Sequence, residues 1–496
     1  MGTSQPPHTY GLVELAPTRV DEGWVVTTSH ARIDLATTPV AFYSHGWHTF
    51  SATDWLPSGH ARSVPPARIM EAVADDPAYV HDSRPSGSGV GAVIDVEGEV
   101  VLLGALGTDG RVALDAGRLV GTCANEVEWF LARGEREAVF AAYARVLGDR
   151  LGRRRTGGLR MWSSWYSFYE DITQQRLRHV LEEVRSWPLD VFQIDDGWQA
   201  AVGDWTANDA FSDGMGDLAE RIRSAGLRPG LWLAPFITWP SARLAADHPE
   251  WLITDADGAP KRVGYNWGDW FYALDLARPE VLDHLEEVIA TVRGWGYEVL
   301  KLDFLYAGAV PGGRANDTPR ELLYRQAVER LRRAAGEDAY LLACGAPIIP
   351  SIGVFDAIRT SADVSPYWEN PVLSDVVGAT SEVGTRGAIT TSLHRLWLQE
   401  VIATDPDVVY FRSRYNMLDP VQRGWLQDLA RVAGFRATSD PPSWLSDAER
   451  EELMAYFEAD PPVTDLGEFR FRLGDREVDF GWLARRPPTI AQLERS

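Results

Sequence analysis

The spacing of apolar and polar residues divides the chain into successive parts. From Gly11 to about Thr122, short runs of alternating apolar residues are separated by turn residues, a pattern typical of an antiparallel β-sandwich. The expected strands are Gly23–Thr28, Ala31–Leu35, Pro39–Tyr43, Gly91–Asp95, Glu99–Leu103 and Arg111–Asp115. Apolar residues at helical spacing then predict one helix over Glu135–Gly152, which we interpret as a linker into the next domain.

From Gly158 onward, strand-like segments alternate with helix-like segments. The expected strands are Leu159–Tyr166, Val191–Asp196, Pro229–Phe236, Tyr272–Leu276, Val299–Leu305, Tyr340–Gly345, Ala357–Ala362 and Asp407–Phe411. The expected helices are Thr173–Trp187, Met215–Ala225, Pro279–Gly294, Thr318–Ala335, Arg386–Ala403 and Pro420–Val432. Strands and helices alternating in this way over about 280 residues predict a closed (β/α)8 barrel.

The remainder of the chain is polar and rich in proline before it offers one helix, Ser446–Ala459, and two strands, Glu468–Leu473 and Glu477–Leu483. This tail predicts a small β appendage, with Pro487–Ser496 poorly ordered. The predicted organisation is therefore a β-sandwich at residues 1–134, a linker helix at 135–157, a (β/α)8 barrel at 158–437 and a C-terminal helix with a β appendage at 438–496.

Composition and charge exclude several classes of partner. The 496 residues carry a net charge of −23, which argues against nucleic acid or an anionic membrane surface. None of the ten histidines forms an H-x-H or H-x-x-x-H group, so a metal-dependent hydrolase is not expected. The polar segment Met1–Tyr10 lacks the pattern of a secretory signal, and no apolar run is long enough to cross a bilayer. These features favour a cytoplasmic enzyme without a cofactor, and they leave the oligomeric state open.

The segment Gly296–Ala309 places two charges inside an apolar strand. Lys301 and Asp303 are two residues apart, so their side chains share one face of the strand. A polar cavity at the end of the strand would accommodate both, and the fixed cation would keep the carboxylate ionised, as a nucleophile requires. The alternative is a buried structural ion pair. Lys261 and Lys301 are the only lysines among 48 basic residues, which makes a lysine here more noteworthy.

Other polar residues also follow the expected C-terminal ends of strands, where (β/α)8 barrels carry their chemistry. They are Asp195 and Asp196, Cys344, and Arg359 with Asp363, joined by the indoles of Trp165, Trp205 and Trp267. Carboxylates and a lysine bind vicinal hydroxyls, and indoles cover the C–H face of a sugar ring. Hydrolysis of a glycosidic bond needs one ionised and one protonated carboxyl group. Asp303 fits the first role and Asp363 the second, although Asp363 alone could be a turn or N-cap residue.

Eight motifs occur in the order found in a known enzyme family. They are W-S-S-W-Y at 162–166, Q-I-D-D-G-W at 193–198 with G-D-W at 203–205, G-L-W-L-A-P-F at 230–236, H-P-E-W-L at 248–252, Y-A-L-D-L at 272–276, K-L-D-F-L at 301–305, C-G-A-P at 344–347 and R-T-S-A-D at 359–363. Over about Gly11 to Val432 the chain resembles the α-galactosidases of glycoside hydrolase family 36, of the short bacterial type. The resemblance implies hydrolysis of terminal α-D-galactosyl residues of oligosaccharides with net retention, through a covalent intermediate and without a metal.

The resemblance also implies a role for each matching residue. Asp303 resembles the nucleophile and Asp363 the acid/base. For the galactose ring, Asp195 and Asp196 match the pair at the 4- and 6-hydroxyls, Lys301 the residue at the 3- and 4-hydroxyls, Arg359 a residue near the 2-hydroxyl, Cys344 a small residue bordering the 2-position, and Trp267 a wall of the pocket. Family members add a ring from the sandwich domain, which Trp47 or Phe50 of the G-W-H-T-F-S loop would supply. Phe50 stands where a second tryptophan is common.

Three alternatives remain open at this point. The same machinery would also suit an α-N-acetylgalactosaminidase or a transglycosylase of the raffinose-synthase kind. A non-catalytic sugar-binding protein is a candidate from a different class, although it would not need both Asp303 and Asp363.

Overall fold

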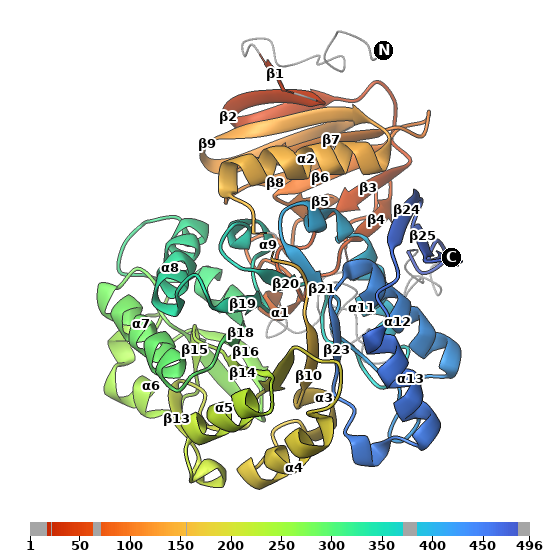
Figure 1. The fold of residues 1–496 in the computed structure, drawn as a ribbon. Helices are drawn as coiled ribbons and strands as arrows, with labels where there is room; N and C mark the ends of the chain where they lie inside the picture. Colours follow the sequence, from red (N-terminus) through yellow and green to blue (C-terminus); the bar gives the residue numbers. More distant parts are fainter. Residues whose placement is uncertain (1–16, 21, 63–70, 155, 371–383, 485–496) are drawn as a thin grey trace.

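The computed structural model describes residues 17–20, 22–62, 71–154, 156–370 and 384–484. Within these residues the chain forms an N-terminal antiparallel β domain, a central parallel barrel ringed by helices, and a small C-terminal β sheet (Figure 1). The expected disorder of Pro487–Ser496 and the expected polar segment Met1–Tyr10 lie outside the described residues. No helix in the described ranges combines the length and apolar character needed to cross a bilayer.

The N-terminal domain is a forked antiparallel sheet that folds into two layers. Its strands are β1 (Thr18–Val20), β2 (Gly23–Asp34), β3 (Ala41–Ser44), β4 (Asp54–Pro57), β5 (Ser86–Ser88), β6 (Val90–Ile94), β7 (Val100–Ala105), β8 (Arg111–Asp115) and β9 (Arg118–Gly134), with a short helix α1 (Glu71–Ala74). The first part of β9 pairs with β8 and its last part pairs with β7, so the sheet divides along this strand. Val93, Val112 and Leu114 belong to one buried apolar cluster between the two layers. The predicted sandwich is confirmed as a fold class.

Helix α2 (Arg136–Leu151) lies between the sandwich and the barrel. Tyr143 donates a hydrogen bond to the carbonyl of Ala105 in β7 over 2.9 Å. On the barrel side, the Trp397 ring lies 5.6 Å from that of Tyr143 and 6.2 Å from that of Phe140. The apolar face that predicted this helix therefore contacts both neighbours.

The central sheet is a parallel barrel. Its strands are β10 (Arg160–Ser163), β11 (Val191–Ile194), β14 (Arg228–Leu233), β18 (Val299–Leu302), β19 (Tyr340–Ala343), β20 (Ala357–Arg359), β21 (Ala403–Asp405), β22 (Val408–Val409) and β23 (Arg436–Thr438). β21 pairs with β20 and β22 pairs with β23, while Pro406 and Asp407 alone separate β21 from β22. The two short strands are thus one interrupted seventh strand, and the sheet closes through it.

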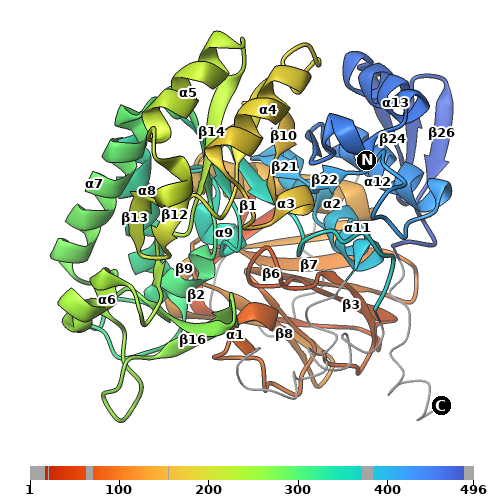
Figure 2. The same ribbon diagram turned by 90° about the horizontal axis from the view of Figure 1, so that it is seen from below.

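Helices surround this barrel on its outer side (Figure 2). They are α4 (Gln174–Val184), α5 (Met215–Ser224), α7 (Pro279–Gly294), α8 (Arg320–Ala335), α11 (Thr385–Leu393) and α12 (Pro420–Ala433). Shorter elements in the connecting loops are α3 (Trp165–Phe168), β12 (Gln199–Ala201), β13 (Asp204–Ala207), η2 (Asp209–Phe211), β15 (Ile237–Thr238), α6 (Arg243–Asp247), η3 (Pro249–Trp251), β16 (Arg262–Asn266), β17 (Asp269–Ala273), η4 (Leu305–Ala309), α9 (Ile348–Ser351), η5 (Leu396–Glu400) and η6 (Pro442–Trp444). The expected helix Arg386–Ala403 is divided into α11 and η5.

The structure corrects one expected barrel strand and adds one that was not expected. Tyr272–Leu276 is not the fourth barrel strand, because β14 pairs directly with β18. Its first two residues, Tyr272 and Ala273, belong instead to the end of β17, which pairs antiparallel with β15 and β16 in a small separate sheet. The alternating burial along β17 fits such a sheet, whereas barrel strands are buried on both faces. The missing strand is β23, whose three residues are too few to give a pattern in the sequence.

The C-terminal part consists of α13 (Asp447–Glu458) and a three-stranded antiparallel sheet of β24 (Val463–Gly467), β25 (Arg470–Leu473) and β26 (Arg476–Asp479). A reciprocal capping box between Ser446 and Glu449 starts the helix. β24 was not expected, because its residues are mostly exposed and carry little apolar signal.

One buried arginine connects the sandwich to the barrel. Arg395, with 0% of its surface exposed, donates to the carbonyls of Thr49 (2.7 Å), His48 (3.0 Å) and Ser51 (2.7 Å) in the sandwich loop. The same guanidinium donates to the carbonyl of Thr360 over 2.8 Å, directly after β20. The loop that carries Trp47 and Phe50 is thereby fixed against the end of a barrel strand.

Candidate active site

The polar residues picked out by the sequence lie where the barrel strands end. Asp195 and Asp196 follow β11, Asp303 follows β18, Cys344 follows β19, and Arg359 is the last residue of β20. All five are buried. Because the strands are parallel, their C-terminal ends meet at one mouth of the barrel, as the sequence predicted.

Lys301 lies on the fourth barrel strand and contacts two carboxylates. Its Nζ is 2.9 Å from Oδ2 of Asp195 and 4.0 Å from Oδ2 of Asp303. Burial lowers the pKa of Lys301, but Asp195 and Asp303 more than offset this effect and the net shift is upward. The ammonium therefore stays charged at neutral pH and joins two strands of the site.

Asp303 is held by donors on both carboxylate oxygens. Oδ2 accepts a hydrogen bond from Trp232 Nε1 over 3.1 Å, and Oδ1 accepts one from the Phe304 amide over 2.7 Å. Phe304 itself has φ of +51°, a left-handed conformation that is uncommon outside glycine. Burial raises the pKa of Asp303, whereas Lys301 and these two donors lower it; the net direction is upward. Lys301 thus limits the rise without reversing it.

Asp196 is a second buried carboxylate, and it has neutral partners. Gln199 donates to Oδ1 over 2.6 Å and Trp267 Nε1 donates to Oδ2 over 2.6 Å. Burial raises the pKa of Asp196 to about 6, although both hydrogen bonds oppose the rise. Trp267 sits in the turn between β16 and β17 with φ of +54°, and its ring lies 5.2 Å from that of Phe304. The hairpin that replaces the expected fourth strand therefore delivers this indole to the site.

Arg359 and Asp363 lie together on the opposite part of the mouth. Arg359 Nη1 is 2.9 Å from Oδ1 of Asp363, and the Asp363 side chain is 46% exposed. The charge of Asp363 acts on Asp303 and adds to the rise in its pKa. Cys344 is fully buried, and the charges of Asp303 and Asp363 both act on its thiol.

Besides Tyr166 of the W-S-S-W-Y motif, three residues of this site were not among the predicted site residues. Arg359 pairs with Asp405 (Nε to Oδ2, 3.2 Å) and with Asp407 (Nη1 to Oδ2, 2.9 Å), and Tyr166 donates a hydrogen bond to Asp407. The T-D-P-D run at 404–407 was a usable signal, but the expected strand began at Asp407 and so placed these carboxylates at the wrong end. Trp232 was a third omission, hidden inside an apolar strand.

The remaining predicted indoles occupy different positions. Trp205 is buried, with its ring 5.9 Å from that of Trp232, so it packs behind the residue that contacts Asp303. Trp165 is half-buried in α3 with its ring 5.2 Å from that of Tyr169.

The structure does not bring Trp47 together with these residues. Its ring lies under the guanidinium of Arg320 at 5.3 Å, in a cleft between the sandwich and α8. Phe50 of the same loop lies closer to the barrel mouth, with its ring 6.2 Å from that of Phe304. Of the two rings considered for the sandwich contribution, Phe50 is the one beside the site.

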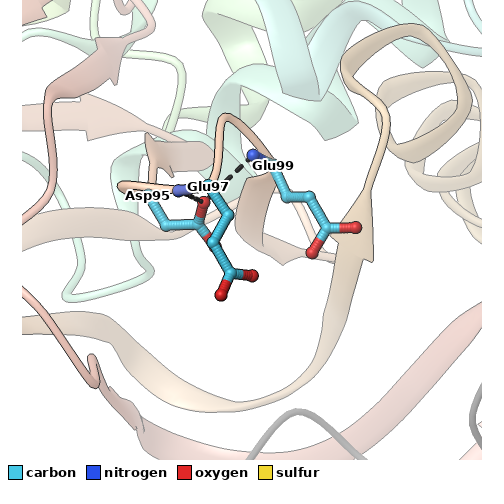
Figure 3. A group of neighbouring side chains, drawn as sticks. All are labelled: Asp95, Glu97 and Glu99. Carbon is cyan, nitrogen blue, oxygen red and sulfur yellow. Dashed lines mark hydrogen bonds between the residues drawn. The ribbon is translucent and has the colours of Figure 1, made fainter.

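An acidic group far from the barrel mouth has the composition of a metal site. Asp95, Glu97 and Glu99 lie close together on the turn between β6 and β7 (Figure 3). Arg133 contacts all three carboxylates at 2.8, 2.7 and 2.9 Å. The group is therefore an ion-pair network around one guanidinium.

Comparison with known proteins decides the family. A family model described as Melibiase matches residues 156–304. The structure of TtGalA, an α-galactosidase from Thermus thermophilus in complex with p-nitrophenyl α-D-galactopyranoside, is 43% identical with a TM-score of 0.89 over 94% of this chain and 96% of that chain. The chain belongs to the α-galactosidases of glycoside hydrolase family 36.

More distant relatives of this family 36 chain share parts of it. The family 36 α-galactosidase AgaA from Geobacillus stearothermophilus has the same fold, with 14% identity and a TM-score of 0.61 over 88% of this chain and 63% of that chain. A probable α-galactosidase C from Aspergillus flavus is 30% identical over 29% of this chain. That match spans 21% of the length of the Aspergillus protein.

Proposed function

We propose that this chain is a retaining α-galactosidase that removes terminal α-D-galactosyl residues from oligosaccharides. The observation that carries the proposal is the setting of Asp303, a buried carboxylate with donors on both oxygens and Lys301 beside it, at the same barrel mouth as the more exposed Asp363. Double displacement requires two carboxyl groups, one as the nucleophile and one as the acid/base. TtGalA, at 43% identity, has been solved with stachyose as well as with the aryl galactoside.

The mechanism assigns the two carboxyl groups successive tasks. Asp303 attacks the anomeric carbon while the bond to the leaving oxygen breaks and Asp363 gives its proton to that oxygen. Water then attacks the same carbon, Asp363 takes up a proton from it, and Asp303 leaves as the carboxylate. Two inversions give net retention of the α-anomer.

The other residues suit recognition of a galactose ring. Asp195 with Lys301 and Asp196 with Trp267 form two hydrogen-bonding pairs that would bind neighbouring hydroxyls. A site that bonds the axial 4-hydroxyl rejects glucose, because its buried polar groups would then lack partners. The indole of Trp267 would cover the apolar face of the ring.

The test is the product formed first from an α-galactoside, followed by proton NMR. Early appearance of α-galactose supports retention, whereas early β-galactose would exclude Asp303 as a nucleophile. Rates on the nitrophenyl α-galactoside and on its gluco and 2-acetamido analogues separate the sugar specificities. A faster reaction with the 2-acetamido analogue would favour an α-N-acetylgalactosaminidase, and transfer of galactose to an added sugar instead of water would favour a transglycosylase. Binding with no turnover would leave a sugar-binding protein.

A further inference from the structure

One nitrogen of Arg359 lies between two carboxylates that differ in burial. Nη1 is 2.9 Å from Oδ1 of Asp363 and 2.9 Å from Oδ2 of Asp407. The Asp363 side chain is 46% exposed and the Asp407 side chain is 1% exposed. Because water screens exposed charges more than buried ones, Asp407 holds the guanidinium more strongly than Asp363 does.

Asp407 is itself fixed from several directions. Its Oδ2 accepts hydrogen bonds from the Tyr166 hydroxyl and from the Val364 amide, the latter over 2.9 Å, and its Oδ1 accepts one from the Val408 amide over 2.8 Å. Its backbone has φ of +84°, a conformation that is strained outside glycine. Val364 directly follows Asp363. Asp407 therefore positions both the backbone next to Asp363 and the cation beside it.

This geometry bears on a difficulty in the proposed mechanism. Asp363 has to carry a proton before the glycosidic bond breaks, yet a guanidinium in contact favours the ionised carboxylate. We propose that Asp407 is a positioning residue that balances the charge of Arg359 and so allows Asp363 to keep the proton that it gives to the leaving oxygen. The proposal rests on the α-galactosidase function proposed above and concerns the same site.

Several other charged or titratable groups lie around Asp363 and Arg359, and Arg359 is the one cation in this set of described residues. The others are Tyr166 and Tyr169 after β10, Asp303 after β18, Cys344 after β19, and Asp405, which forms an ion pair with the Nε of Arg359. Burial raises the pKa of Asp407 to about 7, Arg359 opposes the rise and Asp363 adds to it. Asp363 and Asp407 thus share one guanidinium nitrogen as their partner.

The decisive variant is Asp407→Asn, in which the amide oxygen can still accept from Val364 but carries no charge. We expect the basic limb of kcat/KM against pH to move down by about one pH unit, since Arg359 then acts on Asp363 alone. At pH 8 the loss should be about tenfold or more for melibiose, whose leaving group needs the proton, and smaller for p-nitrophenyl α-galactoside. A purely structural role would lower both rates without moving the limb.

Two further variants keep the proposal falsifiable. Tyr166→Phe removes a hydrogen bond to Asp407 without changing any charge, so the limb should stay in place even if the rate falls. Asp405→Asn removes a charge from the other side of Arg359 and should move the limb in the same direction as Asp407→Asn, which covers the case in which Asp407→Asn does not fold. An unmoved limb in the folded Asp407 or Asp405 variant overturns the inference. A wild-type protein without α-galactosidase activity would instead refute the proposed function.

Discussion

Asp303 and Asp196 are buried carboxylates only a few strands apart, yet their partners differ. Burial raises the pKa of both, but Asp303 has an ammonium at 4.0 Å, whereas the hydrogen-bond donors to Asp196 are the neutral Gln199 and Trp267. The Asp303 site therefore favours an anion more than the Asp196 site does. This difference fits attack on carbon at Asp303 and hydroxyl binding at Asp196.

Replacing Asp303 by glycine should abolish turnover of α-galactosides, because no carboxylate remains to form the covalent intermediate. Sodium azide should then restore release of nitrophenol from p-nitrophenyl α-galactoside, with β-galactosyl azide as the sugar product. We would follow nitrophenol by absorbance and identify the azide by NMR. Substantial hydrolysis of melibiose by the Asp303→Gly protein would show that another residue is the nucleophile.

Stability should depend on pH through Asp196. Its pKa is raised from 3.8 to about 6, so its favourable contribution is present below pH 4 and is lost as the pH rises through 6. Asp196→Asn should therefore increase the free energy of unfolding at pH 7.5, by up to about 3 kcal/mol, and have little effect near pH 4. The Gln199 amide can turn toward the new partner only by giving up the hydrogen bond that its oxygen accepts from the Gly197 amide over 3.2 Å, so about 3 kcal/mol is an upper limit. Urea unfolding at both pH values measures the effect.

Asp195, the residue before Asp196, provides a control in which the free energy of unfolding should change in the opposite direction. Asp195→Asn leaves Lys301 without its 2.9 Å partner, and it should destabilise the protein at pH 7.5 by about 3 kcal/mol. Equal destabilisation by both substitutions would contradict the account of Asp196.

At this scale the sequence predicted most of the cluster. Asp195, Lys301, Asp303 and Arg359 could be placed because each stands at the end of an apolar run, where a parallel barrel exposes side chains. Trp47 could not be separated from Phe50 in the same way. Which ring of a loop turns toward the barrel depends on contacts such as Arg320 over Trp47, and those are distant in sequence.

The residues that follow β18 and β19 pack closely against each other, and this packing holds the Phe304 amide beside Asp303. Gly345 has φ of +54°, and a Cβ there would lie 2.9 Å from the Phe304 amide nitrogen and 3.1 Å from the Phe50 ring. The Phe304 amide is the donor to Asp303. A glycine is therefore required at position 345, because a larger residue would collide with the chain that follows β18.

Gly345→Ala should displace Phe304 and lower kcat/KM by about tenfold or more, since small misplacements of a catalytic group are costly. Gly434→Ala is a matched control, because Gly434 has φ of +74° with nothing near its would-be Cβ and lies at the end of α12. It should reduce stability but leave kcat/KM unchanged. Steady-state kinetics with thermal unfolding of both variants gives the comparison, and equal loss of activity in both would count against a local effect at Asp303.

Helices and strands could be predicted from the sequence where the apolar pattern extends over many residues. The order of the strands in the barrel sheet could not. The helices α4, α5, α7 and α8 carry the expected apolar faces, and the parallel strands β10, β11, β14 and β18 are almost entirely buried. The segment at Tyr272 was assigned to the barrel because it has strand-forming residues, although its pairing is antiparallel. A three-residue strand such as β23 is defined by its neighbours on both sides, and a local pattern contains no such information.

For the molecule as a whole, the contact between sandwich and barrel depends heavily on Arg395. Replacement by methionine, which keeps much of the volume, would leave the carbonyls of Thr49, His48, Ser51 and Thr360 without this donor. We expect the free energy of unfolding to fall by at least about 3 kcal/mol, because unsatisfied buried groups are costly. Activity should fall as well, since Thr360 directly follows Arg359. Arg395→Lys, which keeps the charge and some donors, should be less severe, and a methionine variant as stable as the wild type would contradict this reading.

The contacts of Arg395 also limit which β-sandwich domains from other proteins could replace the native one. Its acceptors are backbone carbonyls, so the match depends on the path of the 46–51 loop and hardly at all on the side chains along it. A foreign sandwich grafted onto this barrel would have to reproduce that path to within a hydrogen-bond length. Heating should accordingly melt the two domains in one calorimetric peak, and chimaeras that ignore the loop should show two.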